Sequence, residues 1–181
     1  MKMKKFNDKA PMPIIAIDFD DTISIGDDYP NCSVIRPWAK TVINFMHALG
    51  IKIVIWTSRD VAYNQEEKQM YDHLTPMLKF LEDQDVKYDA INKSVQFSPY
   101  AYNGRKIYAH MYVDDRGYGW DGDDSGDDTV MLSVLTSFLH RVCGFSKESA
   151  LQTTRCCKRF EEPEKWMVDA VSSWKRRDYM V

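Results

Sequence analysis

One short segment constrains the fold of this chain more than any other. It extends from Ile14 to Thr22 and reads IIAIDFDDT. An apolar run rich in isoleucine predicts a strand that is buried on both faces, as in a parallel sheet. Two carboxylates, Asp18 and Asp20, come at the point where this strand should end. Because ligands bind at the carboxyl ends of the strands in open α/β sheets, the segment predicts a ligand site there.

The two carboxylates also constrain the chemistry of that site. Side chains two residues apart in an extended segment point to the same side, so Asp18 and Asp20 should repel each other. A cation or a shared proton would offset this repulsion. The alternative is an acidic turn or a helix N-cap, in which both side chains only accept backbone N–H groups. Of these interpretations, a cation-binding site is the one that predicts a function.

Hydrophobic periodicity predicts an α/β fold around this first strand. The expected elements are a helix at about 37–50, a strand at 51–56, a second helix opening at the capping pair Asn64 and Glu67, and short strands at 88–91 and 111–113. Pro76 lies inside the second helical stripe and should kink or break it. Right-handed crossovers between such strands give a parallel sheet with helices on both faces.

Changes in charge and in hydrophobic pattern along the chain divide it into four parts. We expect an N-terminal tail at 1–12, a catalytic core at 13–120, an acidic linker at 121–128 and a C-terminal helical extension at 129–181. Three amphipathic stretches, at about 129–142, 147–160 and 163–174, predict the helices of this extension.

Composition excludes several classes of protein. The chain has 181 residues, of which 44% are apolar, and a net charge of −3, so it suits one globular domain with no strong attraction to nucleic acid or membranes. No apolar run is long enough to span a membrane, and the lysine-rich start lacks the apolar stretch of a secretory signal. Four cysteines without CxxC spacing give no disulfide framework. We therefore expect a cytoplasmic protein.

The motif Asp-x-Asp-x-Thr after an apolar strand resembles the first signature of the haloacid dehalogenase superfamily, most of whose members are phosphatases. Asp21 stands where the commonest pattern of that family has glycine. The second signature is matched by the strand that ends in Thr57, and the fourth by the strand that ends in Asp114 and Asp115. Over residues 13–119 the chain is similar to small members from bacteria and phages, which implies a Rossmann-like fold without a large cap domain.

The resemblance implies a role for each matching residue. Asp18 would be the nucleophile, Asp20 the general acid and base, and Thr57 a phosphate ligand through its hydroxyl and backbone N–H. Mg²⁺ would be the cofactor. Its expected ligands are Asp18, Asp20, Asp114 and Asp115, and the expected substrate-binding residues are Ser58, Arg59 and Lys93.

The family's phosphate-binding lysine has two candidates in this sequence. Lys106 is preferred, because a lysine shortly before a strand that ends in Asp-Asp-Arg is similar to the deoxynucleotidase branch. It would lie at the wrong end of the sheet unless a turn occupies about 107–110, since a fully extended segment of that length is too long. Lys93 is the alternative.

Together these patterns predict a Mg²⁺-dependent phosphohydrolase that forms an aspartyl-phosphate. Its partner would be a small phosphorylated substrate, and the resemblance to deoxynucleotidases suggests a nucleotide monophosphate. The alternative is a non-catalytic regulatory or nucleic-acid-binding protein on the same fold. The segment 138–155, with Gly144 in its turn, resembles a helix-turn-helix and would carry the nucleic acid.

Overall fold

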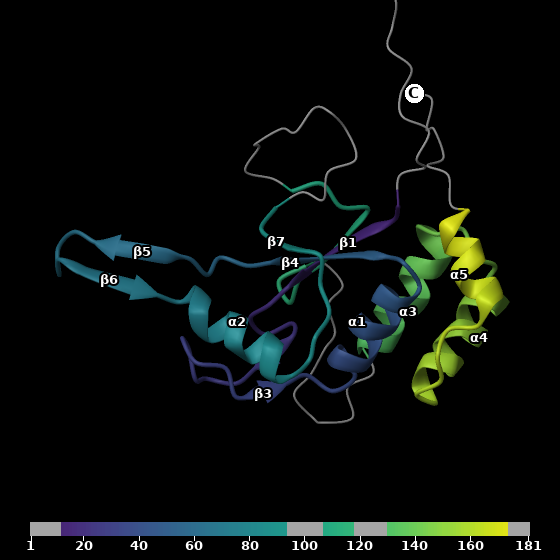
Figure 1. The fold of residues 1–181 in the computed structure, drawn as a ribbon, viewed down its shortest axis with the longest axis horizontal. Helices are drawn as coiled ribbons and strands as arrows, with labels where there is room; N and C mark the ends of the chain where they lie inside the picture. The colour runs from purple at the N-terminus through teal and green to yellow at the C-terminus, as the bar shows by residue number, and fades with distance from the viewer. Residues whose placement is uncertain (1–11, 94–106, 118–129, 174–181) are drawn as a thin grey trace, which may run out of the picture.

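A four-stranded parallel sheet forms the centre of the molecule (Figure 1). The computed structural model describes residues 12–93, 107–117 and 130–173. The strand order is β7-β4-β1-β8, so the isoleucine-rich segment is a central strand. The strands are β1 (Ile14–Asp18), β4 (Lys52–Trp56), β7 (Ala90–Ile91) and β8 (Met111–Val113). The predicted α/β class and Rossmann-like parallel sheet are therefore confirmed.

The register of the sheet brings the predicted site residues to one edge. Asp18 is the partner of Trp56 on β4, and Ile17 is the partner of Val113 on β8. Thr57 and Asp114 are each the first residue after their strand. Because all four strands are parallel, Asp18, Thr57 and Asp114 reach the same carboxyl edge.

The two faces of the sheet are covered differently. On one face, Ile15, Ile17, Ile53 and Ile55 share a large core cluster with the buried side chains of the helices. On the other face, Ile14, Ala16 and Val54 form a smaller cluster with Ile107. In the part of the chain that the structure describes, the helices thus gather on one face, which corrects the prediction of helices on both faces. Each fully buried isoleucine contributes about 1.5–3 kcal/mol to stability.

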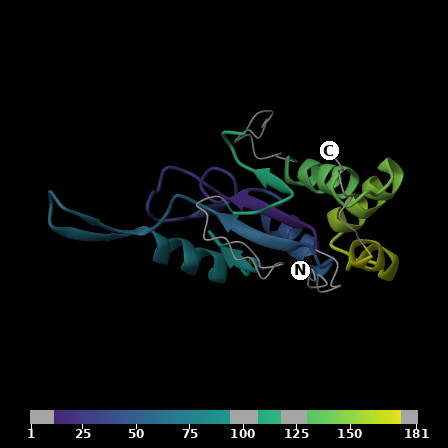
Figure 2. The same cartoon turned by 90° about the horizontal axis from the view of Figure 1, so that it is seen from above.

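The C-terminal helices belong to this same core. They are α3 (Val130–Arg141), α4 (Lys147–Lys158) and α5 (Lys165–Ser172), close to the predicted stretches. Leu135 and Phe138 of α3 are fully buried in the main cluster, and α3 packs against α1 (Ala39–Ala48). Gly144 has a φ of +77° in the turn between α3 and α4. Figure 2 shows the three helices together at one end of the molecule. The predicted linker at 121–128 lies outside the described residues.

The predicted second helix is wrong at its start. Residues 61–72 form a two-stranded antiparallel hairpin, β5 (Val61–Asn64) and β6 (Gln69–Asp72), which projects from the body in Figure 1. Asn64 does accept the backbone N–H groups of Glu66 and Glu67, at 2.9 and 3.2 Å, but this interaction closes the turn of the hairpin. A capping pattern and a turn use the same hydrogen bonds locally, so the sequence did not distinguish them.

The helix itself, α2 (Leu74–Asp83), begins ten residues later than Asn64. Asp72 caps it by accepting the backbone N–H groups of Leu74 and Thr75, at 3.0 and 2.8 Å. Pro76 is therefore in the first turn, where no backbone N–H is needed for the helix. The predicted kink does not arise, because the proline is not in the helix interior.

The segment between β1 and α1 contains only a small antiparallel pair, β2 (Ser24–Ile25) and β3 (Val34–Ile35). Helix α1 begins at Ala39, two residues after Pro37, because Trp38 adopts a left-handed conformation with φ of +67°. As predicted, no large cap domain separates the first two motifs.

Candidate active site

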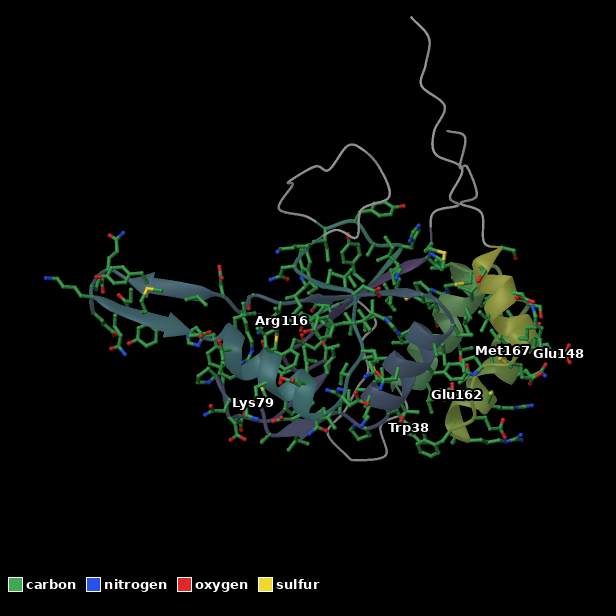
Figure 3. All side chains as sticks on the ribbon, viewed as in Figure 1. Trp38, Lys79, Arg116, Glu148, Glu162 and Met167 are labelled. Atoms are coloured by element: carbon green, nitrogen blue, oxygen red, sulfur yellow. The ribbon has the colours of Figure 1, made fainter. Side chains whose placement is uncertain are left out.

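Three carboxylates converge at the carboxyl edge of the sheet. Asp18 from β1 and Asp114 and Asp115 from the loop after β8 each offer an oxygen, and these atoms lie within 4.8 Å of one another. Arg116 (labelled in Figure 3) gives them little compensation, because its Nε lies 3.9 Å from the Asp115 carboxylate and its side chain is 87% exposed. These three carboxylates, the acidic triad, carry like charges that a cation would offset.

The electrostatic cost of the triad is visible in its protonation. The pKa of Asp18 is raised to about 7, first by burial and then by the charges of Asp114, Asp115 and Asp20, against a backbone hydrogen bond from Phe19 that lowers it. Burial and the charge of Asp114 also raise the pKa of Asp115. Without a cation, the triad therefore retains a proton near neutral pH.

The donor set of the triad fits one class of metal ion. It consists of carboxylate oxygens alone, with neither histidine nor cysteine among its members. Hard cations such as Mg²⁺ and Ca²⁺ prefer such ligands, whereas zinc and copper favour nitrogen and sulfur. The residues are therefore suited to hold the predicted Mg²⁺.

Thr22 joins the two halves of the triad, a role that the sequence analysis missed. Its buried hydroxyl accepts the backbone N–H of Asp115 at 3.0 Å and donates to Asp18 Oδ2 at 3.4 Å. Arg36, also buried, donates to the carbonyls of Thr22 and Asp21 at 3.1 and 2.6 Å and so fixes this loop. The only signal for Thr22 was its place at the end of the first motif.

Asp21 shows why its motif position often carries glycine in the similar family. Its φ is +57°, in the left-handed region that glycine enters without strain. Aspartate tolerates this region better than most residues do. The departure from the family pattern therefore leaves the loop conformation intact.

A tight turn orients Asp114. Its carboxylate accepts the backbone N–H of Arg116 at 2.9 Å, and its carbonyl accepts that of Gly117 at 2.8 Å. A Cβ atom at Gly117 would lie 2.9 Å from that carbonyl oxygen, which is too close. Glycine is therefore required for the turn that points Asp114 at Asp18.

Asp20 and Arg59 form an ion pair, which the sequence analysis did not predict. The Arg59 guanidinium binds the Asp20 carboxylate, with Nε 3.0 Å from both oxygens and Nη2 2.7 Å from Oδ1. Arg59 is only 3% exposed, and its Nη1 also donates to the carbonyls of Pro30 and His73. Arg59 is thus a buried clamp, which corrects its prediction as a phosphate ligand. Asp20 is outside the triad found among the described residues, so its predicted role as a metal ligand stays a prediction.

Thr57 lies at the predicted edge of the sheet, but its backbone groups are hydrogen-bonded to a side chain of the protein. Its N–H donates to the Asn92 side chain at 2.9 Å, and its carbonyl accepts from the same amide at 2.8 Å. The N–H predicted to hold a phosphate oxygen is therefore already bonded. The hydroxyl accepts the backbone N–H of Arg59 at 3.1 Å, which leaves the hydrogen of the hydroxyl to point elsewhere. No pattern in the sequence indicated Asn92, which is 35 residues away.

The remaining predicted residues are less constrained. Ser58 is exposed beside Thr57 at the carboxyl edge. Lys93 is exposed two residues after β7, which is separated from β1 by β4. Lys106 lies outside the described residues, so the choice between the two lysines stays a prediction.

Comparison with known proteins supports the fold. No family model matches the chain, and no curated protein matches it significantly. A solved structure of a conserved protein from Bacteroides thetaiotaomicron is similar, with a TM-score of 0.53, 19% sequence identity, and coverage of 72% of this chain and 92% of that one. At this identity the similarity shows the fold alone. By its fold, the chain is an α/β protein with a Rossmann-like sheet.

None of the helices in the described residues combines the length and apolar character needed to cross a membrane.

Proposed function

We propose that this chain is a Mg²⁺-dependent phosphomonoester hydrolase with Asp18 as its nucleophile. The observation that carries the proposal is the acidic triad, whose three carboxylate oxygens lie within 4.8 Å of one another at the carboxyl edge of a parallel sheet. Asp18 ends the central strand β1 and is the partner of Trp56, the last residue of β4, which Thr57 follows. The resemblance of the motifs to haloacid dehalogenases supports the same chemistry.

The metal ion would be held by Asp18, Asp114 and Asp115. When bound, it would supply positive charge that offsets repulsion between the Asp18 carboxylate and the anionic phosphate. The same charge would favour the ionised form of Asp18, which is the nucleophilic form.

The reaction would occur in two steps on Asp18. In the first, a carboxylate oxygen attacks the phosphorus, the bond to the leaving oxygen breaks, and an aspartyl-phosphate and an alcohol result. In the second, water attacks the phosphorus, which releases inorganic phosphate and restores the Asp18 carboxylate. Asp20 would give a proton to the leaving oxygen and then take one from the water.

The contacts of Asp20 suggest which of its oxygens carries this proton. Oδ1 accepts two bonds from Arg59, through Nε and Nη2, whereas Oδ2 accepts one. Oδ2 is therefore the oxygen with more capacity for the substrate. Arg59 would act as a positioning residue, which holds Asp20 without touching the phosphate.

The substrate would be a small phosphate ester. A nucleotide monophosphate is the finer proposal, and it rests on the resemblance of residues 106–116 to the deoxynucleotidase branch. The phosphate would meet the hydroxyl of Thr57, with Lys106 or Lys93 as the compensating cation.

Hydrolysis of para-nitrophenyl phosphate tests the proposal. With Mg²⁺ we expect turnover by the wild type, and on the order of a thousandfold or greater loss in Asp18→Asn. Asp83→Asn is the matched control, since Asp83 is an exposed carboxylate that pairs with Lys79 within α2. A chelator should abolish the wild-type activity. Equal rates in wild type and Asp18→Asn would refute the mechanism, and Mg²⁺ binding without turnover would favour the non-catalytic alternative.

A further inference from the structure

Three aromatic rings form a row beside the candidate active site. The Tyr29 and His73 ring centroids are 5.0 Å apart with an interplanar angle of 26°, and those of His73 and Tyr71 are 5.9 Å apart at 7°. Tyr29 comes from the loop between β2 and β3, whereas Tyr71 and His73 come from β6 and the residue that follows it. We call these three residues the aromatic row.

Arg59 connects the aromatic row to Asp20. Its Cζ lies 4.8 Å from the Tyr29 ring centroid, and its Nη1 donates to the backbone carbonyl of His73 at 3.3 Å. The same guanidinium binds the Asp20 carboxylate at 2.7 Å. In the proposed reaction Asp20 meets the leaving oxygen, so the row begins on the leaving-group side of the site.

The aromatic row extends beyond the part that covers the Arg59 guanidinium, so covering Arg59 is not its whole role. Tyr29 is 59% exposed although it contacts the buried guanidinium. The row also continues past Arg59 onto the hairpin, through His73 to Tyr71. Aromatic rings that are held in fixed positions and remain partly exposed bind flat rings by stacking.

The charges around the row narrow the choice of ligand. Asp28, Asp60 and Asp72 belong to the same loop and hairpin base, and Arg59 is already paired with Asp20. A further phosphate or carboxylate on the leaving group would meet negative potential there. An uncharged group would not.

We propose that the aromatic row is the leaving-group subsite, and that the preferred substrates are phosphate monoesters of alcohols with a flat, uncharged aromatic ring. This inference rests on the proposed hydrolase function. A single guanidinium separates Asp20 from Tyr29, so a short spacer would join the ring to the phosphate.

Two matched substrates test this proposal. 2-Phenylethyl phosphate and 2-cyclohexylethyl phosphate have similar leaving alcohols and similar apolar size, but only the first has a flat ring. We expect the wild type to favour the aromatic ester in kcat/KM, and Tyr29→Leu to lose about tenfold of that preference. The loss should fall on the aromatic ester, with little change for the cyclohexyl ester.

Tyr63→Leu is the control, because Tyr63 is a similarly exposed tyrosine on β5 that is outside the row. It should keep the wild-type preference. Turnover of both esters with no aromatic preference would overturn the inference and leave the hydrolase proposal intact. An equal loss on both esters in Tyr29→Leu would also overturn it, because Tyr29 would then serve only to support Arg59. No turnover of either ester by a wild type that hydrolyses para-nitrophenyl phosphate would overturn the inference alone. No turnover of any of the three esters would refute both proposals.

Discussion

The carboxylate of Asp20 and the carboxylates of the acidic triad lie at the same edge of the sheet but in opposite electrostatic surroundings. Asp20 is held by the guanidinium of Arg59, with contacts of 2.7 and 3.0 Å. The acidic triad, by contrast, has only the exposed Arg116 side chain nearby, at 3.9 Å from Asp115. The charge of Asp20 is balanced by a buried arginine. The three carboxylates of the acidic triad have almost no compensating positive charge among the described residues.

This difference separates an ion pair that is balanced inside the protein from a candidate cation site. An internal ion pair such as that of Asp20 and Arg59 holds several segments in place, and its charges are balanced without a cation. A cluster of like charges costs free energy in the absence of a ligand, and a metal ion recovers that cost on binding. The pKa of Asp18, raised to about 7 by burial first and by the neighbouring carboxylates second, reflects burial together with this repulsion.

The largest expected effect tests the balanced pair. Arg59→Met should lower the free energy of unfolding by about 3 kcal/mol, because it leaves the Asp20 carboxylate and two backbone carbonyls without their donor. Chemical denaturation at pH 7 measures this value. Arg116→Met is the control, since its exposed side chain should contribute less than about 0.5 kcal/mol. Similar losses of unfolding free energy in the two variants would contradict the distinction between the Asp20–Arg59 pair and the acidic triad.

A second prediction concerns the unbalanced triad and has the opposite sign. The folded protein binds a proton on Asp18 up to a pH of about 7, whereas the unfolded chain loses it near the ordinary value of 3.8. Wild-type stability should therefore fall as pH rises between these values and level off above the higher one. Asp18→Asn removes this titration, so without metal it should be more stable than wild type.

The gain in Asp18→Asn should reach roughly 2 kcal/mol above neutral pH, after an allowance for the partial exposure of the carboxylate. Thermal unfolding in chelator, from the acid range to above neutral pH, measures it. Added Mg²⁺ should stabilise the wild type and reverse the order of the two proteins. A variant that is less stable than wild type at every pH would contradict the account of the triad.

The smallest effect concerns the bridge between the two strand ends. Thr22→Val should cost about 1 kcal/mol of stability, because the backbone N–H of Asp115 loses its acceptor. It should also weaken Mg²⁺ binding, measured by titration calorimetry, since Asp18 and Asp115 lose their common partner. Thr153→Val, at an equally buried threonine inside α4, should leave Mg²⁺ affinity unchanged. Unchanged affinity in both variants would mean that Thr22 does not organise the triad.

Most of the sheet and the triad could be predicted from the sequence, because both depend on local patterns. The apolar strands before Asp18, Thr57 and Asp114 could be recognised, and parallel strands bring their carboxyl ends together by topology. The convergence of Asp18 with Asp114 and Asp115 was implied by the resemblance of the motifs together with this topology, without knowledge of any side-chain contact.

What could not be predicted depends on contacts between distant residues. Arg59 was expected at the phosphate, but its partner is Asp20, 39 residues earlier in the sequence. The bond from Asp115 to Thr22 spans 93 residues. The hairpin was missed for a different reason, since Asn64 makes the same local hydrogen bonds in a turn as at a helix start.

The hairpin of β5 and β6 closes on itself where it leaves the body. Val61 pairs with Asp72, and the backbone N–H of His73 donates to the carbonyl of Asp60 at 3.1 Å. Its tip can therefore lengthen or shorten during evolution without moving β4 or α2. If the hairpin base helps to select the alcohol, substrate choice can diverge in descendants of this chain while the bond-breaking residues stay fixed.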